Sequence, residues 1–450
     1  MYCNLIKRSL ATFLGTPIHR LTSPQTDVSL LCWVRSVRRH KERLFIDLSD
    51  GLSSHHLQAI VTPSPELADQ ISAGSSVRIH GDLVESRGRG QKLELVAKHV
   101  EVVGKCDNTK YPFRPRKTYL VDHERSLQHF RPRLEKYAAV HRVRNRLVQG
   151  IHSYFQELDF FQVQTPILTT NDCEGAGETF VVHHADDLKP NSRTKLTSPS
   201  VAEAAAESTV TPGDNLPSPQ QQQQQQQPET RQLPYFATQC HLTVSGQLHL
   251  EALVHSISRV YTMQPAFRAE NALSRKHLCE FEMLEAELVA ESLDAVVSLA
   301  EGLIKHVWAA VRQMDEFQTI GQAWRDSVDE ALGANFVQLS YDEALRHLDG
   351  KPVEPLRWGE DLNNEHEKML LKLFQGRPVI VTGFPADLKP FYMAVRGGEV
   401  SEGDSSRPVA DCFDLLLPVC GEVVGGSMRE ADLTRLQSAI ERAGVNGLEW

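Results

Sequence analysis

Residues 265–287 read PAFRAENALSRKHLCEFEMLEAE, a short segment that crowds charges of both signs around a few apolar residues. We interpret the segment as a β-hairpin, with one strand up to Glu270, a loop through His277 and a return strand after it. Because side chains alternate along a strand, Arg268 and Glu270 share one face of the hairpin. The folded chain therefore needs partners for the charged side chains on this face.

The residue types of the hairpin match what ATP binding requires. An arginine on a sheet face can hold a phosphate through two N–H groups, and the loop cations Arg275 and His277 could close over further phosphates. Phe281 could stack on a flat base, and the carboxylates could bind Mg²⁺ or an amino group. The charge cluster taken alone favours a solvated, salt-bridged hairpin, so an ATP site needs support from the rest of the chain.

Towards the N-terminus the pattern changes to short β-strands, which predict a small β-barrel over residues 26–105. The first strand buries every second residue, namely Val28, Leu30, Cys32 and Val34. On a later strand Phe45 lies on the polar face, and Arg35 and neighbouring cations flank it. An aromatic ring beside cations suits single-stranded nucleic acid, because bases stack on the ring while the cations hold phosphates. For Phe45 alone, packing beneath a loop is the favoured alternative.

A second domain is expected over residues 133–450, after a linker or hinge rich in Pro and Arg at 106–132. A helix over 133–158 precedes strands and helices with short connections, which predict a mostly antiparallel sheet flanked by helices, hence an α+β fold. Residues 185–232 are rich in Ser, Pro, Ala and Thr and contain eight consecutive glutamines. We interpret them as a disordered insertion.

The composition excludes several classes of protein. The net charge of −10 argues against a histone-like nucleic-acid binder but allows RNA binding through a local basic patch. None of the eight cysteines sits in a C-x-x-C pair, so the sequence indicates neither a disulfide framework nor a zinc site. No apolar run is long enough to span a bilayer, and we expect no membrane partner.

The N-terminal segment is basic and amphipathic, with no acidic residue before Asp27. Its cations are Lys7, Arg8, His19 and Arg20, and its apolar residues Leu5, Ile6, Leu10, Phe13 and Leu14 can share one helical face. This pattern is typical of a mitochondrial presequence, so we expect a targeting segment over residues 1–25 and a location in the mitochondrial matrix. A mildly basic tail on a cytoplasmic protein is the alternative.

The charged hairpin resembles motif 2 of the class II aminoacyl-tRNA synthetases, in the subgroup for asparagine, aspartate and lysine. Residues 146–168, with Pro166, resemble motif 1, the helix and strand through which the family dimerises. Further segments that fall in the family's order are DCEGAGETF (172–180), LTVSGQLHLE (242–251), WGEDLNNEHEKML (358–370), FPADLKPFYMAV (384–395) and GEVVGGSMRE (421–430). FIDLSDG (45–51) resembles the subgroup's anticodon-binding OB-fold. The resemblance implies an OB-fold barrel, a class II catalytic domain and a homodimer.

Within the subgroup, the chain resembles the asparagine branch. Leu250 stands where the aspartate enzymes carry a lysine that helps to hold the substrate carboxylate, and an amide does not need that charge partner. Glu251, Asn271 and GGSMRE (425–430) also resemble the asparagine branch. The resemblance implies activation of asparagine by ATP and Mg²⁺ and transfer of asparagine to tRNA(Asn). The aspartate branch is the alternative.

The resemblance also implies roles for the hairpin residues in ATP binding. Arg268 would bind the α-phosphate and stabilise the transition state as the amino-acid carboxylate attacks. His277 and Arg275 would contact the outer phosphates, and Phe281 would stack on adenine. Glu422 would help to coordinate magnesium, although it could instead cap a turn.

A further set of roles concerns the amino acid and the tRNA. Arg429 would hold the asparagine side-chain oxygen and Glu270 its amide nitrogen, although Arg429 could instead pair with the neighbouring Glu430 or Asp432. Ser245 and Gln247 would line the amino-acid pocket, and Glu178 would hold the α-amino group. Phe45, with Arg35, would read the middle uridine of the anticodon by stacking and hydrogen bonds.

The family's motif 3, a glycine-rich strand and helix with an arginine that clamps the γ-phosphate, is expected soon after residues 431–444. The sequence stops at VNGLEW (445–450) without this motif, so we expect a catalytic domain incomplete at its C-terminal end. Two hypotheses follow. The chain is a ligase, continued beyond these residues or weakly active, or it is a catalytically inactive chain that still dimerises or binds tRNA.

Overall fold

The computed structural model describes residues 16–88, 90–170, 179–184, 239–271, 277–318, 322–396 and 407–444. The insertion predicted over 185–232 lies outside these residues. The chain divides into two compact units. Unit 1 comprises the chain up to Tyr154, Val296–Thr382 and Phe413–Gly426, and unit 2 comprises Phe155–Ala295, Gly383–Cys412 and the chain from Ser427.

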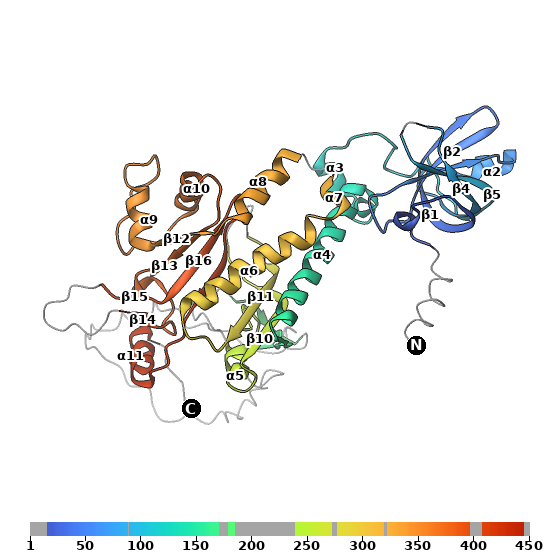
Figure 1. The fold of residues 1–450 in the computed structure, drawn as a ribbon. Coiled ribbons are helices and arrows are strands. Elements are labelled where there is room, and N and C mark those ends of the chain that lie inside the picture. The colour runs from blue at the N-terminus through green and yellow to red at the C-terminus, as the bar shows by residue number, and fades with distance from the viewer. Residues whose placement is uncertain are drawn as a thin grey trace, which may run out of the picture. The chain divides into compact units, whose positions relative to one another are not determined.

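The N-terminal part of unit 1 is a closed β-barrel with the strand order β1-β2-β3-β5-β4, drawn in blue in Figure 1. Its strands are β1 (Gln25–His40), β2 (Arg43–Ser49), β3 (Leu57–Val61), β4 (Ser76–Glu85) and β5 (Leu93–Gly104). The helix α2 (Pro65–Gln70) connects β3 to β4, and the 3₁₀ turn η1 (Ile18–Arg20) precedes β1. β3 and β5 run parallel, and the other neighbours run antiparallel.

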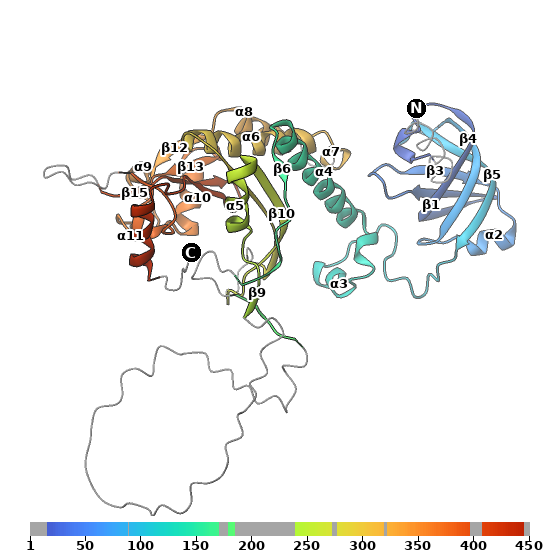
Figure 2. The same cartoon turned by 90° about the horizontal axis from the view of Figure 1, so that it is seen from below.

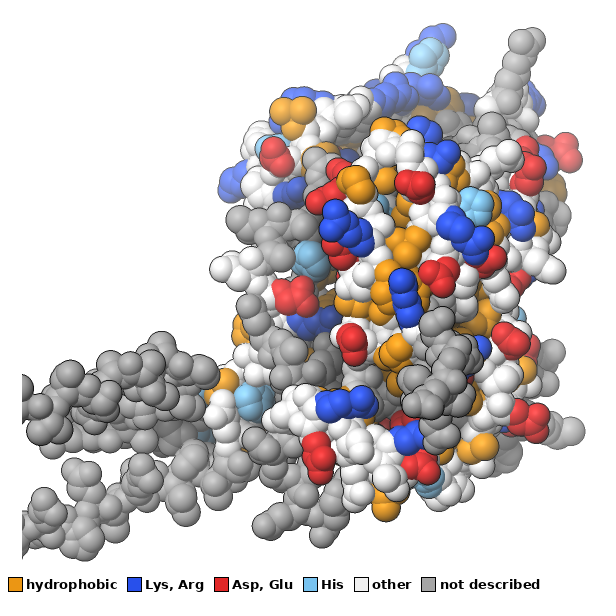
Figure 3. Space-filling model, turned by 90° about the vertical axis from the view of Figure 1, so that its left-hand side faces the viewer, with side chains coloured by type: hydrophobic (Ala, Val, Ile, Leu, Met, Phe, Trp, Pro, Cys, Tyr) orange, Lys and Arg blue, Asp and Glu red, His pale blue; other side chains and the backbone are white. Residues whose placement is uncertain are grey.

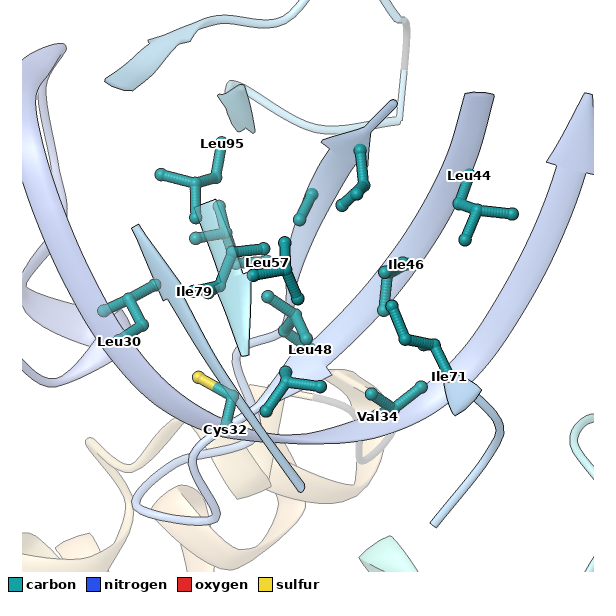
Figure 4. Close-up of a cluster of buried hydrophobic side chains, with 14 of the residues drawn as sticks. Leu30, Cys32, Val34, Leu44, Ile46, Leu48, Leu57, Ile71, Ile79 and Leu95 are labelled. Atoms are coloured by element: carbon teal, nitrogen blue, oxygen red, sulfur yellow. The ribbon is translucent and has the colours of Figure 1, made fainter. Parts of the chain in front are cut away.

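The barrel interior is filled by the apolar residues that alternate along the strands. The predicted inward residues Val28, Leu30, Cys32 and Val34 are all buried, and Figure 4 shows the last three pointing towards side chains of the other strands. Each fully buried aliphatic side chain contributes about 1.5–3 kcal/mol relative to an exposed one. Burial also raises the pKa of the Cys32 thiol to about 12, so this thiol is unreactive in the folded barrel.

Short helices lie between the barrel and the long helix α4 (Glu135–Glu157), namely α3 (Val121–Ser126) and the 3₁₀ turn η2 (Arg131–Arg133). The side chain of Glu124 on α3 is only 3% exposed, and it pairs with Lys136 Nζ at 2.5 Å. The Tyr137 hydroxyl donates to the same carboxylate over 3.0 Å. These two bonds attach α3 to the start of α4, so the predicted linker over 106–132 contains an ordered, docked segment.

The helix α4 packs against α6 (Leu293–Val311), and both ribbon views show the two helices side by side (Figures 1 and 2). The Tyr154 hydroxyl of α4 donates to the carbonyl of Leu299 over 2.9 Å, and Ser153 Oγ lies 3.0 Å from a ring nitrogen of His306. The helices α7 (Asp315–Gln318) and α8 (Gln322–Gly333) follow α6.

The remaining sheet of unit 1 has the order β12-β13-β16-β17. Its strands are β12 (Val337–Ser340), β13 (Val379–Thr382), β16 (Cys412–Leu417) and β17 (Gly421–Ser427), accompanied by α9 (Tyr341–Leu348) and α10 (Asn364–Leu373). β12 and β13 pair in parallel, whereas β13 and β16 pair antiparallel. Buried β-branched residues fill the central strand β13, as expected for a strand covered on both faces.

Unit 2 contains the charged hairpin, formed by β10 (Arg259–Phe267) and β11 (Glu280–Leu288), with α5 (Gln247–Ile257) packed on both strands. The strand β6 (Phe161–Gln162) pairs with β10 in parallel, and β7 (Leu168–Thr169), β9 (Cys240–Leu242) and β8 (Val181–Val182) form a second small sheet. The last elements are η4 (Ala386–Leu388), β14 (Val395–Arg396), β15 (Val409–Ala410) and α11 (Leu433–Ala443).

Two sequence predictions for the strands have different outcomes. The strand predicted over 160–168 is interrupted at Pro166, and β6 and β7 lie on either side of it, as expected. The sequence KPFYMAV (389–395) predicts a strand, and only its C-terminal part is confirmed: Met393 forms a bridge with Arg429, and Val395 and Arg396 pair with β15. Pro390 lacks the N–H group that a sheet ladder needs, and the segment up to Tyr392 turns instead. Among the described helices, none has the length and apolar character needed to cross a membrane.

Candidate active site

The two strands of the charged hairpin place its aromatic and acidic residues on one face. In the antiparallel register Ala266 lies opposite Phe281, Thr262 opposite Glu285 and Val260 opposite Glu287. The side chains of residues 281, 285 and 287 therefore share one face of β11, because side chains alternate. This face carries an aromatic ring at one end and two carboxylates at the other.

Four residues gather at the loop end of the hairpin. The guanidinium carbon of Arg268 lies 5.8 Å from the ring centroid of Phe281, and Nη1 lies 3.8 Å from a carboxylate oxygen of Glu270. The other oxygen of Glu270 lies 3.7 Å from His277 Nε2. Arg268 and Glu270 are about one third exposed, and such long, exposed ion pairs are weak. An incoming phosphate can therefore replace Glu270 as the partner of these cations.

A second cluster surrounds Arg429, just after β17. Nη2 of Arg429 donates to Glu287 over 2.5 Å, Nη1 donates to Ser427 Oγ over 2.7 Å, and Nε lies 2.8 Å from Glu251 Oε1. The Tyr392 ring covers the guanidinium, with its centroid 4.9 Å from the guanidinium carbon. Arg429 thus pairs with carboxylates far away in the sequence. The alternative partners Glu430 and Asp432 are its close neighbours in the chain.

The electrostatics of the Arg429 cluster are dominated by Glu287. The pKa of the Glu287 carboxyl is raised to about 7: burial is the largest cause, the nearby carboxylates of Glu251 and Glu285 act in the same direction, and Arg429 opposes the shift. A carboxyl group that titrates near neutral pH is characteristic of functional sites. The charge of this cluster therefore changes within the physiological pH range.

The turn before α5 is held by the neighbouring carboxylate of Glu285. Ser245 Oγ donates to Glu285, the Gly246 amide donates to the same carboxylate over 2.8 Å, and the Gln247 amide donates to Ser245 Oγ over 3.0 Å. A side chain on Gly246 would place its Cβ only 2.7 Å from Thr165 Oγ1, so only glycine fits. This packing fixes the start of α5, from which Gln247 and Glu251 project.

Two carboxylates of unit 1 flank Gly425 on β17. A Cβ on this glycine would lie 3.5 Å from Glu422 Oε1 and 3.7 Å from Asp414 Oδ1. Carboxylate oxygens are ligands that Mg²⁺ prefers, and Mg²⁺ usually takes one or two of them and completes its shell with waters and substrate phosphates. The pair fits that pattern. Within the described ranges no group of three or more His, Cys, Asp or Glu residues is arranged to hold a metal ion.

The barrel carries a cavity of about 350 Å³ beside Phe45. Its lining residues are Arg35, Ser36, Arg38, Phe45, Asp47, Gln58, Gln91, Pro115 and Arg116. The guanidinium carbon of Arg38 lies 5.1 Å from the Phe45 ring centroid. Arg35 donates through Nη1 to the carbonyl of Arg133 over 2.8 Å and through Nη2 to Ser49 Oγ over 3.3 Å. The ring therefore lines a cavity together with Arg35, Arg38 and Arg116.

The chain is similar to known proteins along most of its length. A family model described as tRNA synthetases class II (D, K and N) matches residues 122–197 and 219–449, and an OB-fold nucleic acid binding domain model matches residues 28–103. The asparagine–tRNA ligase of Oleidesulfovibrio alaskensis is 36% identical over 94% of this chain and 86% of that protein. The asparaginyl-tRNA synthetase of Mus musculus is 35% identical over 94% of this chain and 81% of that protein.

This chain belongs to the class II asparaginyl-tRNA synthetases. Among solved structures, the asparaginyl-tRNA synthetase of Pyrococcus horikoshii complexed with asparaginyl-adenylate aligns with a TM-score of 0.73 and 24% identity. The alignment covers 96% of this chain and 87% of that protein. The Entamoeba histolytica asparaginyl-tRNA synthetase aligns with a TM-score of 0.71 and 21% identity, over 93% of this chain and 84% of that protein. These likenesses confirm the predicted fold of barrel and class II domain.

The synthetase brings most of the predicted site residues into two groups. Arg268, Glu270, His277 and Phe281 form the first group, and Ser245, Gln247 and Arg429 belong to the second. Glu422 lies in unit 1, beside Asp414. Arg275 and Glu178 lie outside the described residues.

Several residues of the synthetase site were missed by the sequence reasoning. Glu285 and Glu287 could have been found, because they alternate with Phe281 along one strand face. Tyr392 and Asp414 have no comparable local signal, since only the fold brings them to Arg429 and Glu422. On the face drawn in Figure 3, Lys and Arg side chains are interspersed with Asp and Glu.

Proposed function

We propose that this chain is an asparagine–tRNA ligase, which activates asparagine with ATP and transfers it to the 3′ end of tRNA(Asn). The observation that carries the proposal is the single face of β11, with Phe281 at one end and Glu287, which holds Arg429, at the other. Six residue steps along the strand separate the two ends by about 20 Å. An extended aminoacyl-adenylate fits this arrangement, with its base at the ring and its amino acid at the arginine.

The first step is attack of the asparagine carboxylate on the α-phosphorus of ATP, with pyrophosphate as the leaving group. Such phosphoryl chemistry depends on positioning and charge neutralisation and needs no protein nucleophile. Arg268 stabilises the charge that develops on the α-phosphate, while His277 and Arg275 contact the outer phosphates and Phe281 stacks on adenine. Glu422 and Asp414 would hold a Mg²⁺ ion, which would supply positive charge when bound.

The amino acid is selected by the Arg429 cluster. Arg429 holds the side-chain carbonyl oxygen of asparagine. Glu270, which the resemblance assigns to the amide nitrogen, lies instead beside Arg268 at the Phe281 end of the face. Gln247 and Ser245 line the pocket, and Glu178 holds the α-amino group. The carboxylates of Glu251 and Glu287 outnumber the single guanidinium, which favours a neutral amide over the carboxylate of aspartate.

The tRNA is recognised by the barrel. The cavity beside Phe45 accepts a base of the anticodon, which stacks on the ring, while Arg35 and its neighbours hold the RNA backbone. In the second step the adenylate passes its asparaginyl group to the 3′-terminal ribose of the tRNA.

Amino-acid-dependent exchange of pyrophosphate into ATP tests the proposal. Exchange with asparagine but not with aspartate is the expected result. Exchange with aspartate alone assigns the chain to the aspartate branch. No exchange with either amino acid, together with retained tRNA binding, identifies a catalytically inactive RNA-binding chain. Arg268→Ala is the negative control for the chemical step.

A homodimer is also proposed. It is supported by apolar side chains exposed on motif 1, on β8 and on α5, namely Phe161, Ile167, Leu168, Val181 and Leu248. Exposed apolar groups of this kind mark protein interfaces. Sedimentation should show a dimer for the parent chain and a monomer for Phe161→Asp. Val289→Asp, at an exposed apolar position outside these segments, should remain dimeric.

A location in the mitochondrial matrix is proposed from the basic, acid-free composition of residues 1–20. Residues 1–15 lie outside the described residues. A fluorescent protein fused behind residues 1–25 should enter mitochondria, and the same fusion with Lys7→Glu and Arg8→Glu should not. Diffuse cytoplasmic fluorescence of the unmodified fusion would contradict the proposal.

A further inference from the structure

Four side chains of unit 2 form a closed circuit around the amino-acid site. The Tyr392 hydroxyl donates to Gln247 Oε1 over 3.3 Å, and Gln247 Nε2 donates to Glu251 Oε1 over 2.8 Å. Glu251 Oε1 lies 2.8 Å from Arg429 Nε, and the guanidinium of Arg429 lies 4.9 Å from the Tyr392 ring centroid. The circuit therefore begins and ends on Tyr392, which contacts one member through its hydroxyl and another through its ring.

The backbone holds these side chains in place from three separate segments. Gln247 and Glu251 are four residues apart on α5, so they project from the same helix face. Residues 392–394 run alongside residues 428–430, because the Glu430 amide donates to the Tyr392 carbonyl and the Ala394 amide donates to the Met428 carbonyl, each over 2.9 Å. Tyr392 and Arg429 therefore lie on neighbouring extended segments whose spacing does not depend on their side chains.

The circuit allows one direction of hydrogen bonding. A carboxylate paired with arginine can only accept, so Gln247 has to turn its NH₂ group towards Glu251. Its carbonyl oxygen then faces Tyr392, whose hydroxyl has to donate its single proton. The hydroxyl therefore stabilises the orientation of the Gln247 amide that Glu251 requires. Tyr392 and Glu251 together hold Gln247 in one orientation.

The same residue restricts Arg429. The tyrosine ring covers one face of the guanidinium, while Ser427 and Glu287 each accept from one terminal nitrogen. Each terminal nitrogen carries a second N–H, and these two N–H groups are the ones that can reach a substrate oxygen. A cation–π contact contributes about 0.5–2 kcal/mol and sets the plane of the guanidinium.

We propose that Tyr392 is a positioning residue for the selection of asparagine, acting through Arg429 and Gln247. The inference rests on the proposed function and deepens it, because it concerns the same amino-acid site. It assigns Tyr392 to recognition of the amino acid and not to ATP binding or to folding, so its loss should raise the KM for asparagine and leave the KM for ATP nearly unchanged.

The test compares Tyr392→Phe and Tyr392→Leu with the parent chain in pyrophosphate exchange, with calorimetric binding of asparagine as a readout that needs no turnover. Loss of the hydroxyl should raise the asparagine KM and Kd about threefold to tenfold, as for one buried hydrogen bond. Loss of the ring as well should raise them further and narrow the preference for asparagine over aspartate. The ATP KM should change less than about twofold.

Tyr154→Phe is the matched control, because its hydroxyl also donates one hydrogen bond, to the Leu299 carbonyl, in the packing of α4 and α6. An unchanged asparagine KM in both Tyr392 variants overturns the inference. It is also overturned if the ATP KM of these variants rises as much as their asparagine KM, or if the asparagine KM of Tyr154→Phe rises as much as theirs. If Tyr392→Leu does not fold, Tyr392→Phe decides alone. A parent chain that neither binds nor activates asparagine overturns the proposed function and this inference with it. Binding by the parent chain with unaffected variants overturns the inference only.

Discussion

Glu287 accepts a 2.5 Å hydrogen bond from Nη2 of Arg429, and its side chain is only 17% exposed. The guanidinium has a second carboxylate, Glu251, at its Nε atom. An ion pair in such a partly buried setting holds its members in place only while both are charged, because removing one charge leaves the other without compensation. The charge of Glu287 therefore controls how firmly the amino-acid arginine is held.

The asparagine KM should depend on pH through Glu287. Its pKa is raised to about 7, mainly by burial, with Glu251 and Glu285 acting in the same direction and Arg429 opposing. Below that pH the carboxyl group is protonated and its ion pair with Arg429 is lost. We expect the asparagine KM to rise as the pH falls from 8 to 6, by at most about tenfold per unit for one proton, in exchange assays that also record the ATP KM.

Glu287→Gln provides the control, because the amide keeps the shape and cannot titrate. The variant should show a raised asparagine KM that no longer changes between pH 8 and pH 6. If both proteins follow the same pH profile, another group is responsible.

The free energy of unfolding should depend on the pH in the direction opposite to the affinity for asparagine. The folded carboxyl of Glu287 has a pKa above its ordinary value, so between about pH 4.5 and 7 the folded chain binds a proton that the unfolded chain does not. The contribution of this group to the free energy of unfolding therefore increases as the pH falls from 7 to 4.5. As the pH falls over this range, the urea midpoint of the parent chain should rise relative to that of Glu287→Gln. A difference that stays constant with pH would contradict the assignment.

Arg268→Ala should abolish most of the activation step. Loss of a preorganised charged donor at a transition-state oxygen reduces kcat by about 10²–10³. Arg268→Lys should recover only part of the loss, because an ammonium cannot form the two parallel bonds of a guanidinium. Arg259→Ala is the comparison, since this arginine begins β10, the strand that ends just before Arg268, and donates to the Leu158 carbonyl. Equal loss in both alanine variants would point to damage to the strand.

Phe281→Leu should weaken ATP binding. Stacking of a base on an aromatic ring contributes about 1–3 kcal/mol, so we expect the ATP KM to rise by roughly tenfold or more while the asparagine KM changes little. Phe281→Trp keeps a flat ring and should retain most of the affinity. A leucine variant with the ATP KM of the parent chain would place the base elsewhere.

The features that the sequence predicted correctly are local ones. The period-two burial of Val28, Leu30, Cys32 and Val34 depends only on strand alternation, and the hairpin around Arg268 depends on adjacent strands. Such patterns lie within a few residues of each other and are visible in a single sequence.

The features that the sequence could not supply depend on contacts over long distances in the chain. Arg429 pairs with Glu287 across more than a hundred residues, although Glu430 and Asp432 are equally plausible partners from local charge. The parallel pairing of β6 with β10 is likewise set by tertiary contacts. The sequence of so short a strand does not indicate in which direction its partner runs. The position of Tyr392 over Arg429 follows from the backbone pairing of residues 392–394 with residues 428–430, and no local pattern shows that these two segments pair.

The barrel and the catalytic site should be separable by assay. Pyrophosphate exchange needs only ATP and asparagine, whereas charging of tRNA also needs the anticodon cavity. Phe45→Leu removes the ring that faces this cavity, and its cost should be that of one lost base stack, about 1–3 kcal/mol, or roughly tenfold to a hundredfold in the KM for tRNA. The exchange rate should remain that of the parent chain, because residue 45 is not part of the two clusters that bind ATP and asparagine.

Phe45→Tyr, which keeps the ring, should charge tRNA nearly as well as the parent chain. Loss of exchange and charging together in Phe45→Leu would show that the substitution disturbs the fold, and unchanged charging would remove the cavity from tRNA recognition.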